Sequence, residues 1–218
     1  MNEEDLINKT AEDLSKGKAI GWFQGRMEFG PRSLGARSIL GDPRSDKMQK
    51  NLNLKVKYRE SFRPFAPSVL REDLSNWFDI NVDSPYMLLV ANINPEKKIE
   101  MTEEQKKLFG IDKLNIKRSE IPAVTHVDYS ARVQTVSKSS NKRYHALISK
   151  FKEKTGCPVI VNTSFNVRGE PIVNTPGDAF NCFMGTELDY LVIGNCILDK
   201  TKQNPNLKKD YTKEFELD

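Results

Sequence analysis

Residues 25–37 combine the side chains and the backbone freedom that binding a phosphate group requires. This segment follows a short apolar run and holds three glycines, one proline and three arginines. Glycine lets the backbone approach a ligand closely, and arginine can hold phosphate oxygens through two parallel hydrogen bonds. Neither a P-loop nor a Rossmann fingerprint accompanies them. The alternative is a surface turn whose arginines form salt bridges.

A second basic segment, residues 55–63, places its cations at odd positions: Lys55, Lys57, Arg59 and Arg63. On an extended chain such side chains project to one face, where each could neutralise one charge of a ligand with several phosphates. The alternative is a solvated edge strand that is protected by charge. Pro64 and Pro67 argue against a central strand in the part that follows.

Two further candidates lie within residues 126–136. Arg132 stands at the start of a predicted apolar strand, which is a usual position for a ligand-facing cation in an α/β protein. Considered alone, Arg132 is better explained as an exposed surface residue. A single histidine in a strand is more often structural than catalytic, and we expect His126 to be structural.

Polar side chains follow the apolar residues 159–161 directly: Asn162, Thr163, Ser164 and Asn166. An open α/β sheet presents a ligand-binding crevice at the carboxyl ends of its strands, where such groups could orient a ribose or a phosphate. Ser164 lacks the Gly-x-Ser-x-Gly pattern and an evident base partner, so we assign it to binding and not to covalent catalysis. The alternative is a polar turn at the end of a strand.

The elements that must position these residues alternate between strands and helices, which is typical of an α/β protein. Helices are predicted at residues 3–16, 46–52, 74–78 and 141–155 and from residue 175, with Asp46 as a cap of the second. Strands are predicted at residues 19–23, 65–70, 87–93, 124–127, 132–136, 159–161, 190–193 and 197–198. We expect one domain over residues 1–200, with the lysine- and glutamate-rich residues 94–120 as a surface insertion. Residues 201–218 are predicted to form a charged tail whose outermost part is disordered.

Composition narrows the function further. The net charge of the 218 residues is only +4, which argues against a nucleic-acid partner. Three cysteines without CxxC spacing and two distant histidines predict neither a disulfide framework nor a metal site. The acidic N-terminus lacks an apolar signal region, and no run of about 18 apolar residues could span a membrane. We therefore expect no membrane partner and a cytoplasmic location.

Four segments resemble the C-terminal domain of the O-carbamoyltransferases, the family of the nodulation and cephalosporin-type antibiotic enzymes (NodU/CmcH). They are GWFQGRMEFGPRSLGARSILGDPR, VKYRESFRPFAPSVL, ARVQTV and VNTSFNVRGEPIVNTPGDA. They occur in the family's order and cover most of the chain between residues 20 and 198. None of the four segments falls within residues 94–120.

The resemblance implies a YrdC-like fold, a twisted open mixed α/β sheet with flanking helices. In this family the domain takes carbamoyl phosphate and ATP, with Mg²⁺, and makes carbamoyl adenylate while releasing pyrophosphate and phosphate. A Kae1-like N-terminal domain then moves the carbamoyl group to an acceptor hydroxyl, using a histidine-bound metal. No counterpart of that half occurs in the sequence, so we expect it on a separate domain or subunit.

The resemblance also places individual residues at the family's carbamoyl-phosphate and nucleotide positions. It predicts Lys57, Arg63 and Arg132 as catalytic residues. Arg32, Ser164, Asn162 and Asn166 are predicted to bind substrate. No residue of this chain is predicted to bind a metal.

Two other functions stay open from the sequence. The YrdC-like fold also occurs in proteins that make threonylcarbamoyl adenylate and in relatives that bind double-stranded RNA, and the basic residues 55–63 could contact a phosphodiester backbone. The modest net charge and the carbamoyltransferase segments argue against this alternative. A regulatory half without activity is the other alternative, although the arginine, lysine and serine positions are intact. The acceptor and the pathway are not defined by this sequence.

Overall fold

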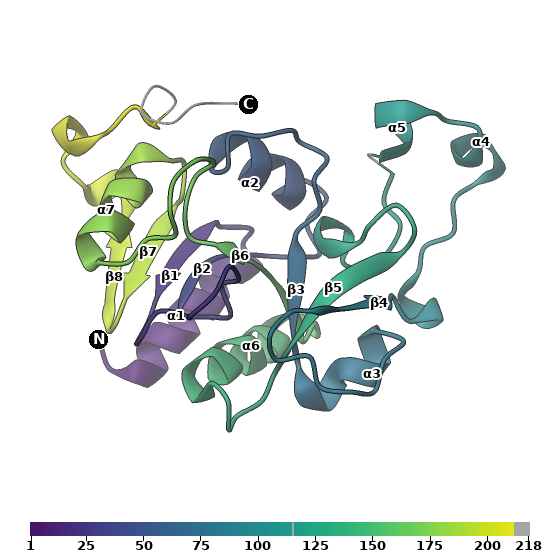
Figure 1. The fold of residues 1–218 in the computed structure, drawn as a ribbon, viewed down its shortest axis with the longest axis horizontal. Coiled ribbons are helices and arrows are strands. Elements are labelled where there is room, and N and C mark those ends of the chain that lie inside the picture. Colours follow the sequence, from purple (N-terminus) through teal and green to yellow (C-terminus); the bar gives the residue numbers. More distant parts are fainter. Residues whose placement is uncertain (115, 212–218) are drawn as a thin grey trace.

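A single mixed sheet of eight strands organises the computed structural model, which describes residues 1–114 and 116–211 (Figure 1). The strand order is β4-β5-β3-β6-β2-β1-β7-β8. The pairs β1/β7 and β3/β5 are parallel, and the other neighbours are antiparallel. The strands are β1 (Ile20–Phe23), β2 (Arg37–Gly41), β3 (Ala66–Leu70), β4 (Leu89–Asn92), β5 (Ser130–Val136), β6 (Val159–Ser164), β7 (Tyr190–Ile193) and β8 (Cys196–Asp199).

Helices flank this sheet, and the two longest lie side by side (Figure 1). The α-helices are α1 (Glu3–Ser15), α2 (Met48–Lys55), α3 (Leu74–Trp77), α4 (Glu103–Lys106), α5 (Gly110–Leu114), α6 (Lys142–Thr155) and α7 (Pro176–Gly185). Helix α6 begins after its cap Asn141 and ends at Gly156, whose φ of 75° is the left-handed conformation that glycine tolerates. The predicted start of α7 is confirmed by a capping box between Thr175 and Asp178.

The prediction that β3 is not a central strand is wrong. β3 lies between β5 and β6, and Pro67 pairs with Val161 of β6. The pairing with β5 begins only at Ser68. Pro67 therefore precedes that ladder, which is where a strand tolerates a residue without an amide hydrogen.

Three other local predictions are wrong. Residues 124–127 form no strand, because a 3-10 turn at Pro122–Val124 leads into a loop. Asp46 does not cap α2; it pairs with Lys117 instead, and the capping position falls on Lys47. The basic residues 55–63 are not extended, since Lys55 ends α2 and Tyr58 has a φ of 47°.

The sequence also misses one strand and underestimates the length of another. Strand β2 was not predicted, although all five of its residues are buried. Strand β6 continues through Ser164, so Asn162 belongs to the sheet and not to the loop that follows. Because its polar residues end a buried strand, the alternation of apolar and polar types does not reveal the full length of β6.

The insertion is mostly exposed, whereas the tail contributes one residue to the core. In residues 94–114 and 116–120, the only buried side chains among those described are Arg118 and Ser119. The tail contains two 3-10 turns and then Tyr211, which is buried and packs against Gly185. The predicted disorder concerns residues 212–218, which lie outside the described part. No helix in the described residues is long and apolar enough to cross a bilayer.

Candidate anion-binding site

The end of β6 opens into a pocket of about 180 Å³. The loop before β2 contributes Arg32 and Ser33 to its wall, and β5 contributes Arg132. Asn162, Thr163 and Ser164 come from β6, while Arg59 comes from the loop before β3. Four residues predicted from the sequence, Arg32, Arg132, Asn162 and Ser164, therefore meet in one pocket.

A larger pocket of about 440 Å³ adjoins the first. The two pockets share Arg59 and Arg132. The larger pocket adds the predicted Arg63, together with His126 and Asp128. His126 is exposed on the wall of this pocket, so its position does not support the expectation that it is structural.

The cations of these pockets repel one another. Partial burial, followed by the charge of Arg32, lowers the pKa of Arg132. Burial lowers the pKa of Arg59 to about 10, and Arg63 contributes to the same effect. The one carboxylate paired with Arg63 is the exposed Glu60, 2.9 Å away, among the residues that the structure describes. A bound anion would relieve this repulsion.

Lys57 lies behind the first pocket and does not line it. Its ammonium group donates to Ser164 O at 2.6 Å and to Asn166 O and Oδ1, both at 2.8 Å. Burial and, less strongly, the charge of nearby Arg59 together lower the pKa of Lys57 to about 7. Ser164 in turn donates to Asn166 Oδ1 at 2.7 Å. Lys57 therefore fixes the end of β6, and Asn166 belongs to this support and not to the pocket wall.

Two buried oxygen atoms of pocket residues have no hydrogen-bond partner among the described residues: Ser33 Oγ and Asn162 Oδ1. The Asn162 amide nitrogen donates to Ser33 O at 3.0 Å and to Gln134 Oε1 at 2.8 Å, which fixes the orientation of the amide. A buried polar atom without a partner costs about 1–3 kcal/mol. A ligand with N–H groups could supply the missing donor to Asn162.

The glycine- and arginine-rich segment is held by its own side chains. Glu28 Oε1 accepts from the backbone amides of Leu34 and Ala36, at 2.6 and 2.7 Å. Arg37 is buried and donates to the backbone oxygens of residues 24 and 25, so it supports the loop and does not face a ligand. Of the three arginines in this segment, only Arg32 lines the pocket. Arg37 binds backbone oxygens and not the carboxylates that the alternative of surface salt bridges predicted.

Sequence reasoning missed Glu28 as the anchor of this loop and did not select Arg59 for the site. The position of Arg59 in the basic segment was a signal for a binding role. The prediction that this segment is extended, however, gave Arg59 and Lys55 the same orientation. In the structure Arg59 Nε donates to Asn53 Oδ1 at 2.7 Å, which holds it toward the pocket. Lys55 instead pairs with Glu187 on the surface.

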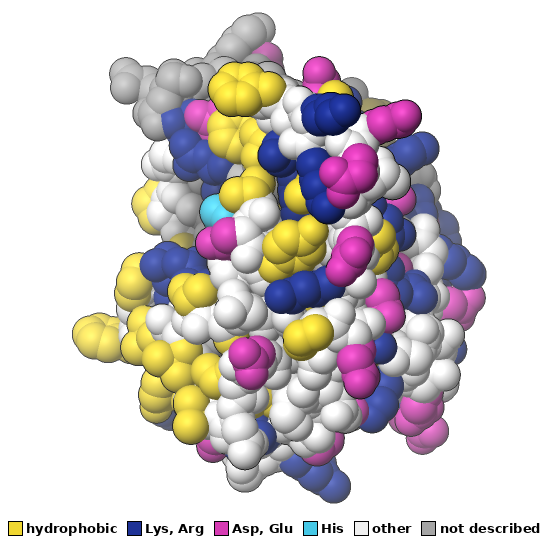
Figure 2. Space-filling view, turned by 90° about the vertical axis from the view of Figure 1, so that its right-hand side faces the viewer, with side chains coloured by type: hydrophobic (Ala, Val, Ile, Leu, Met, Phe, Trp, Pro, Cys, Tyr) yellow, Lys and Arg dark blue, Asp and Glu magenta, His cyan; other side chains and the backbone are white. Residues whose placement is uncertain are grey.

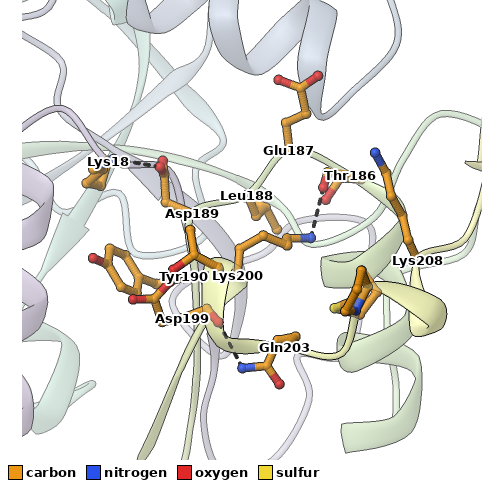
Figure 3. Close-up of a pocket in the computed structure, with 13 residues that line it drawn as sticks. Lys18, Thr186, Glu187, Leu188, Asp189, Tyr190, Asp199, Lys200, Gln203 and Lys208 are labelled. Carbon is orange, nitrogen blue, oxygen red and sulfur yellow. Dashed lines mark hydrogen bonds and ion pairs between the residues drawn. The ribbon is translucent and has the colours of Figure 1, made fainter.

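A bigger pocket, about 570 Å³, lies beside β7, β8 and the tail, and it contains none of the predicted site residues (Figure 3). Its central lysine, Lys200, donates to the backbone oxygens of Phe183 and Thr186 at the end of α7. Lys18 pairs with Asp189 at 2.9 Å. These two cations are engaged by the protein itself, so this pocket is a weaker candidate for an anion than the one beside β6.

The site is thus a pocket with excess positive charge at one end of a mixed α/β sheet. The face at the right of Figure 1 shows Lys and Arg intermixed with Asp and Glu and no continuous basic stripe (Figure 2). This face lacks the basic stripe that a nucleic-acid backbone would contact. The fold and the site define an α/β domain with a pocket lined by basic side chains.

The chain belongs to the family described as Carbamoyltransferase C-terminus, which matches residues 11–200. It is 58% identical over its full length to the uncharacterized Synechocystis protein sll1178, and covers 35% of it. The nodulation protein NolNO of Sinorhizobium fredii is 42% identical over 93% of this chain and 27% of that protein. The 3'-hydroxymethylcephem-O-carbamoyltransferase of Streptomyces clavuligerus is 36% identical over 84% of this chain and 30% of the enzyme.

The chain therefore spans about a third of the length of these relatives or less. Among solved structures, full-length HypF in the phosphate- and nucleotide-bound form has a TM-score of 0.52 at 17% identity. The match covers 87% of this chain and 21% of HypF. It shows the fold alone, and together with the observed strand order it confirms the predicted YrdC-like mixed sheet with flanking helices.

Proposed function

We propose that this chain activates carbamoyl phosphate with ATP, forming carbamoyl adenylate, as the activating half of an O-carbamoyltransferase. The observation that carries the proposal is the meeting of Arg32, Arg132, Asn162 and Ser164 in one pocket. These residues come from three separate segments of the sequence. Membership of the carbamoyltransferase family supports the same reaction class.

The first pocket suits carbamoyl phosphate because its lining combines cations with hydrogen-bonding groups. The guanidinium groups of Arg32, Arg59 and Arg132 can hold the phosphate oxygens. The carbamoyl end carries an NH₂ group, and Asn162 Oδ1 is a buried acceptor that lacks a donor. The pocket of about 180 Å³ therefore offers both partners that a carbamoyl phosphate requires.

The adjoining pocket suits the polyphosphate chain of ATP. Arg63 lines it together with the shared Arg59 and Arg132. No cluster of three metal-ligating side chains occurs in the described residues, and Asp128 is the carboxylate on this wall. Mg²⁺ usually binds through one or two carboxylates and the substrate phosphates, so Asp128 fits a Mg²⁺ that arrives with the nucleotide. The ion would supply further charge neutralisation.

The proposed reaction needs positioning and charge neutralisation more than a covalent intermediate. Water hydrolyses carbamoyl phosphate to carbamate and phosphate. A carbamate oxygen then attacks the α-phosphorus of ATP, the bond from this phosphorus to the oxygen bridging the β-phosphate breaks, and pyrophosphate leaves. Lys57 acts here as a positioning residue, because it holds Ser164 and does not line the pocket.

Transfer to an acceptor is proposed to need a second component. The relatives are about three times longer than this chain, and a Kae1-like N-terminal domain or subunit would fill that role. It would receive carbamoyl adenylate and carry the carbamoyl group to a hydroxyl. That component, and not this chain, would determine which acceptor receives the carbamoyl group.

The test is the exchange of labelled pyrophosphate into ATP, measured with and without carbamoyl phosphate in the presence of Mg²⁺. We expect exchange that depends on carbamoyl phosphate, and its loss in Arg132→Ala. The matched control is Arg26→Ala, since Arg26 is exposed and lines neither pocket. Absence of exchange in the folded protein, both alone and with the companion half, would refute the proposal.

A further inference from the structure

A third pocket, of about 340 Å³, continues from the one assigned to the polyphosphate chain. Arg63, Pro64 and His126 line both pockets. The insertion contributes one wall of the third pocket, through Leu114 of α5 and through Arg118. A ligand held at Arg63 could therefore extend toward the insertion at residues 94–120.

The other walls of this pocket expose apolar surface. Phe62 is 44% exposed and Val127 is 47% exposed, and both line it. These side chains could contact a flat apolar group on its faces. Every base has a flat face that can stack on an aromatic side chain, so this contact does not depend on which base is bound.

Arg118 is the polar residue that stands out on this wall. It is only 5% exposed, and its guanidinium donates to the backbone oxygens of Lys113 and Leu114. None of the carboxylates in residues 1–114 and 116–211 forms an ion pair with it. A buried guanidinium without a counter-charge can stack on or bond to an electron-rich heteroaromatic ring.

We infer that the third pocket binds the base of the nucleotide, so that the insertion at residues 94–120 forms part of the nucleoside subsite. This inference rests on the proposed use of ATP. The base would lie in the third pocket and the phosphates in the second, with the α-phosphorus facing the carbamate in the first pocket. The base would lie between Phe62 and the insertion, with its phosphates directed toward Arg63.

Calorimetric titration of the 218-residue protein with ATP and with tripolyphosphate, each with Mg²⁺, tests the subsite. Phe62→Ala removes the stacking surface, and Leu114→Trp fills the pocket. We expect both variants to bind ATP about tenfold more weakly or worse and tripolyphosphate as well as the unmodified protein does. The control is Phe109→Ala, because Phe109 is 93% exposed on the same insertion and does not line the pocket.

Unchanged ATP affinity in a folded Phe62→Ala variant would overturn the inference, and that variant decides alone if Leu114→Trp does not fold. Equal losses for ATP and tripolyphosphate would also overturn it, since the pocket would then act on the phosphates. The failure of the proposed function is distinguishable from these results. If ATP binding follows the expected pattern without carbamoyl-phosphate-dependent exchange, the subsite stands and the proposed reaction fails. If the unmodified protein binds no ATP, both fail.

Discussion

The ammonium group of Lys57 lies 2.6 Å from the backbone oxygen of Ser164 and 3.2 Å from its hydroxyl, although 107 positions separate the two residues. This contact ties the loop before β3 to the end of β6, directly behind the pocket. The cation is buried and its nearest acceptors are neutral oxygens, two of them backbone carbonyls. These contacts fix one side of the pocket, and burying the cation lowers the stability of the fold by an amount that depends on pH.

Replacing Lys57 by Met should change the pH dependence of stability. The pKa of Lys57 falls from 10.5 to about 7 on folding, so the unfolded chain binds more protons between these values. The free energy of unfolding of the unmodified protein should therefore rise with pH from 7 to 10, by up to about 1.4 kcal/mol per pH unit from this group. Urea unfolding across this range should show a flatter profile for Lys57→Met.

Lys55→Met is the control for that comparison, because Lys55 forms an exposed pair with Glu187 at the surface. Its profile should run parallel to that of the unmodified protein. Parallel profiles for Lys57→Met as well would show that Lys57 keeps an ordinary pKa in the folded protein.

Arg132→Ala should weaken carbamoyl phosphate binding by roughly ten- to a hundredfold, because a hydrogen bond to a charged group is worth about 1.5–3 kcal/mol. Arg26→Ala removes the same charge from an exposed position outside the pocket and should leave the affinity unchanged. Titration calorimetry at fixed salt measures both. Similar losses in the two variants would show that net charge, and not the pocket, attracts the ligand.

Asn162 should distinguish carbamoyl phosphate from acetyl phosphate, which has a methyl group in place of the NH₂ group. We expect the unmodified protein to prefer carbamoyl phosphate by about tenfold, since a buried acceptor left without its donor costs about 1–3 kcal/mol. Asn162→Leu should remove this preference. Competition binding measures the ratio of the two affinities, and inorganic phosphate serves as the control ligand, with unchanged affinity expected. Equal binding of the two acyl phosphates by the unmodified protein would contradict this role.

Gly35→Ala should destabilise the protein by more than about 2 kcal/mol. Gly35 has a φ of 105°, and an added Cβ would lie 2.5 Å from Cδ1 of the buried Tyr144. Gly177→Ala is the control, because its Cβ would meet only Thr175 Oγ1, at 3.6 Å. Thermal unfolding should show a much lower midpoint for Gly35→Ala alone. Equal midpoints would mean that the loop moves at no cost.

The elements with a clear periodic pattern were predictable. Helix α6 follows from its buried face and from Asn141 and Gly156 at its ends. Strand β1 follows from four consecutive apolar or small residues. Strand β2 could not be predicted in this way, because Arg37 and Ser38 are polar residues. They become buried only when β1 and β6 pair with β2 on either side.

For the site, the sequence by itself determined which residue types are available and, through its family motifs, which segments carry them. Only the tertiary structure decided their roles. Lys57 and Arg59 are two positions apart, yet one is buried behind Ser164 and the other lines the pocket. The left-handed Tyr58 between them breaks the extended pattern from which a single cationic face was predicted. Side-chain direction in a loop depends on contacts with β6, which lies about a hundred residues away in the chain, and local sequence does not contain that information.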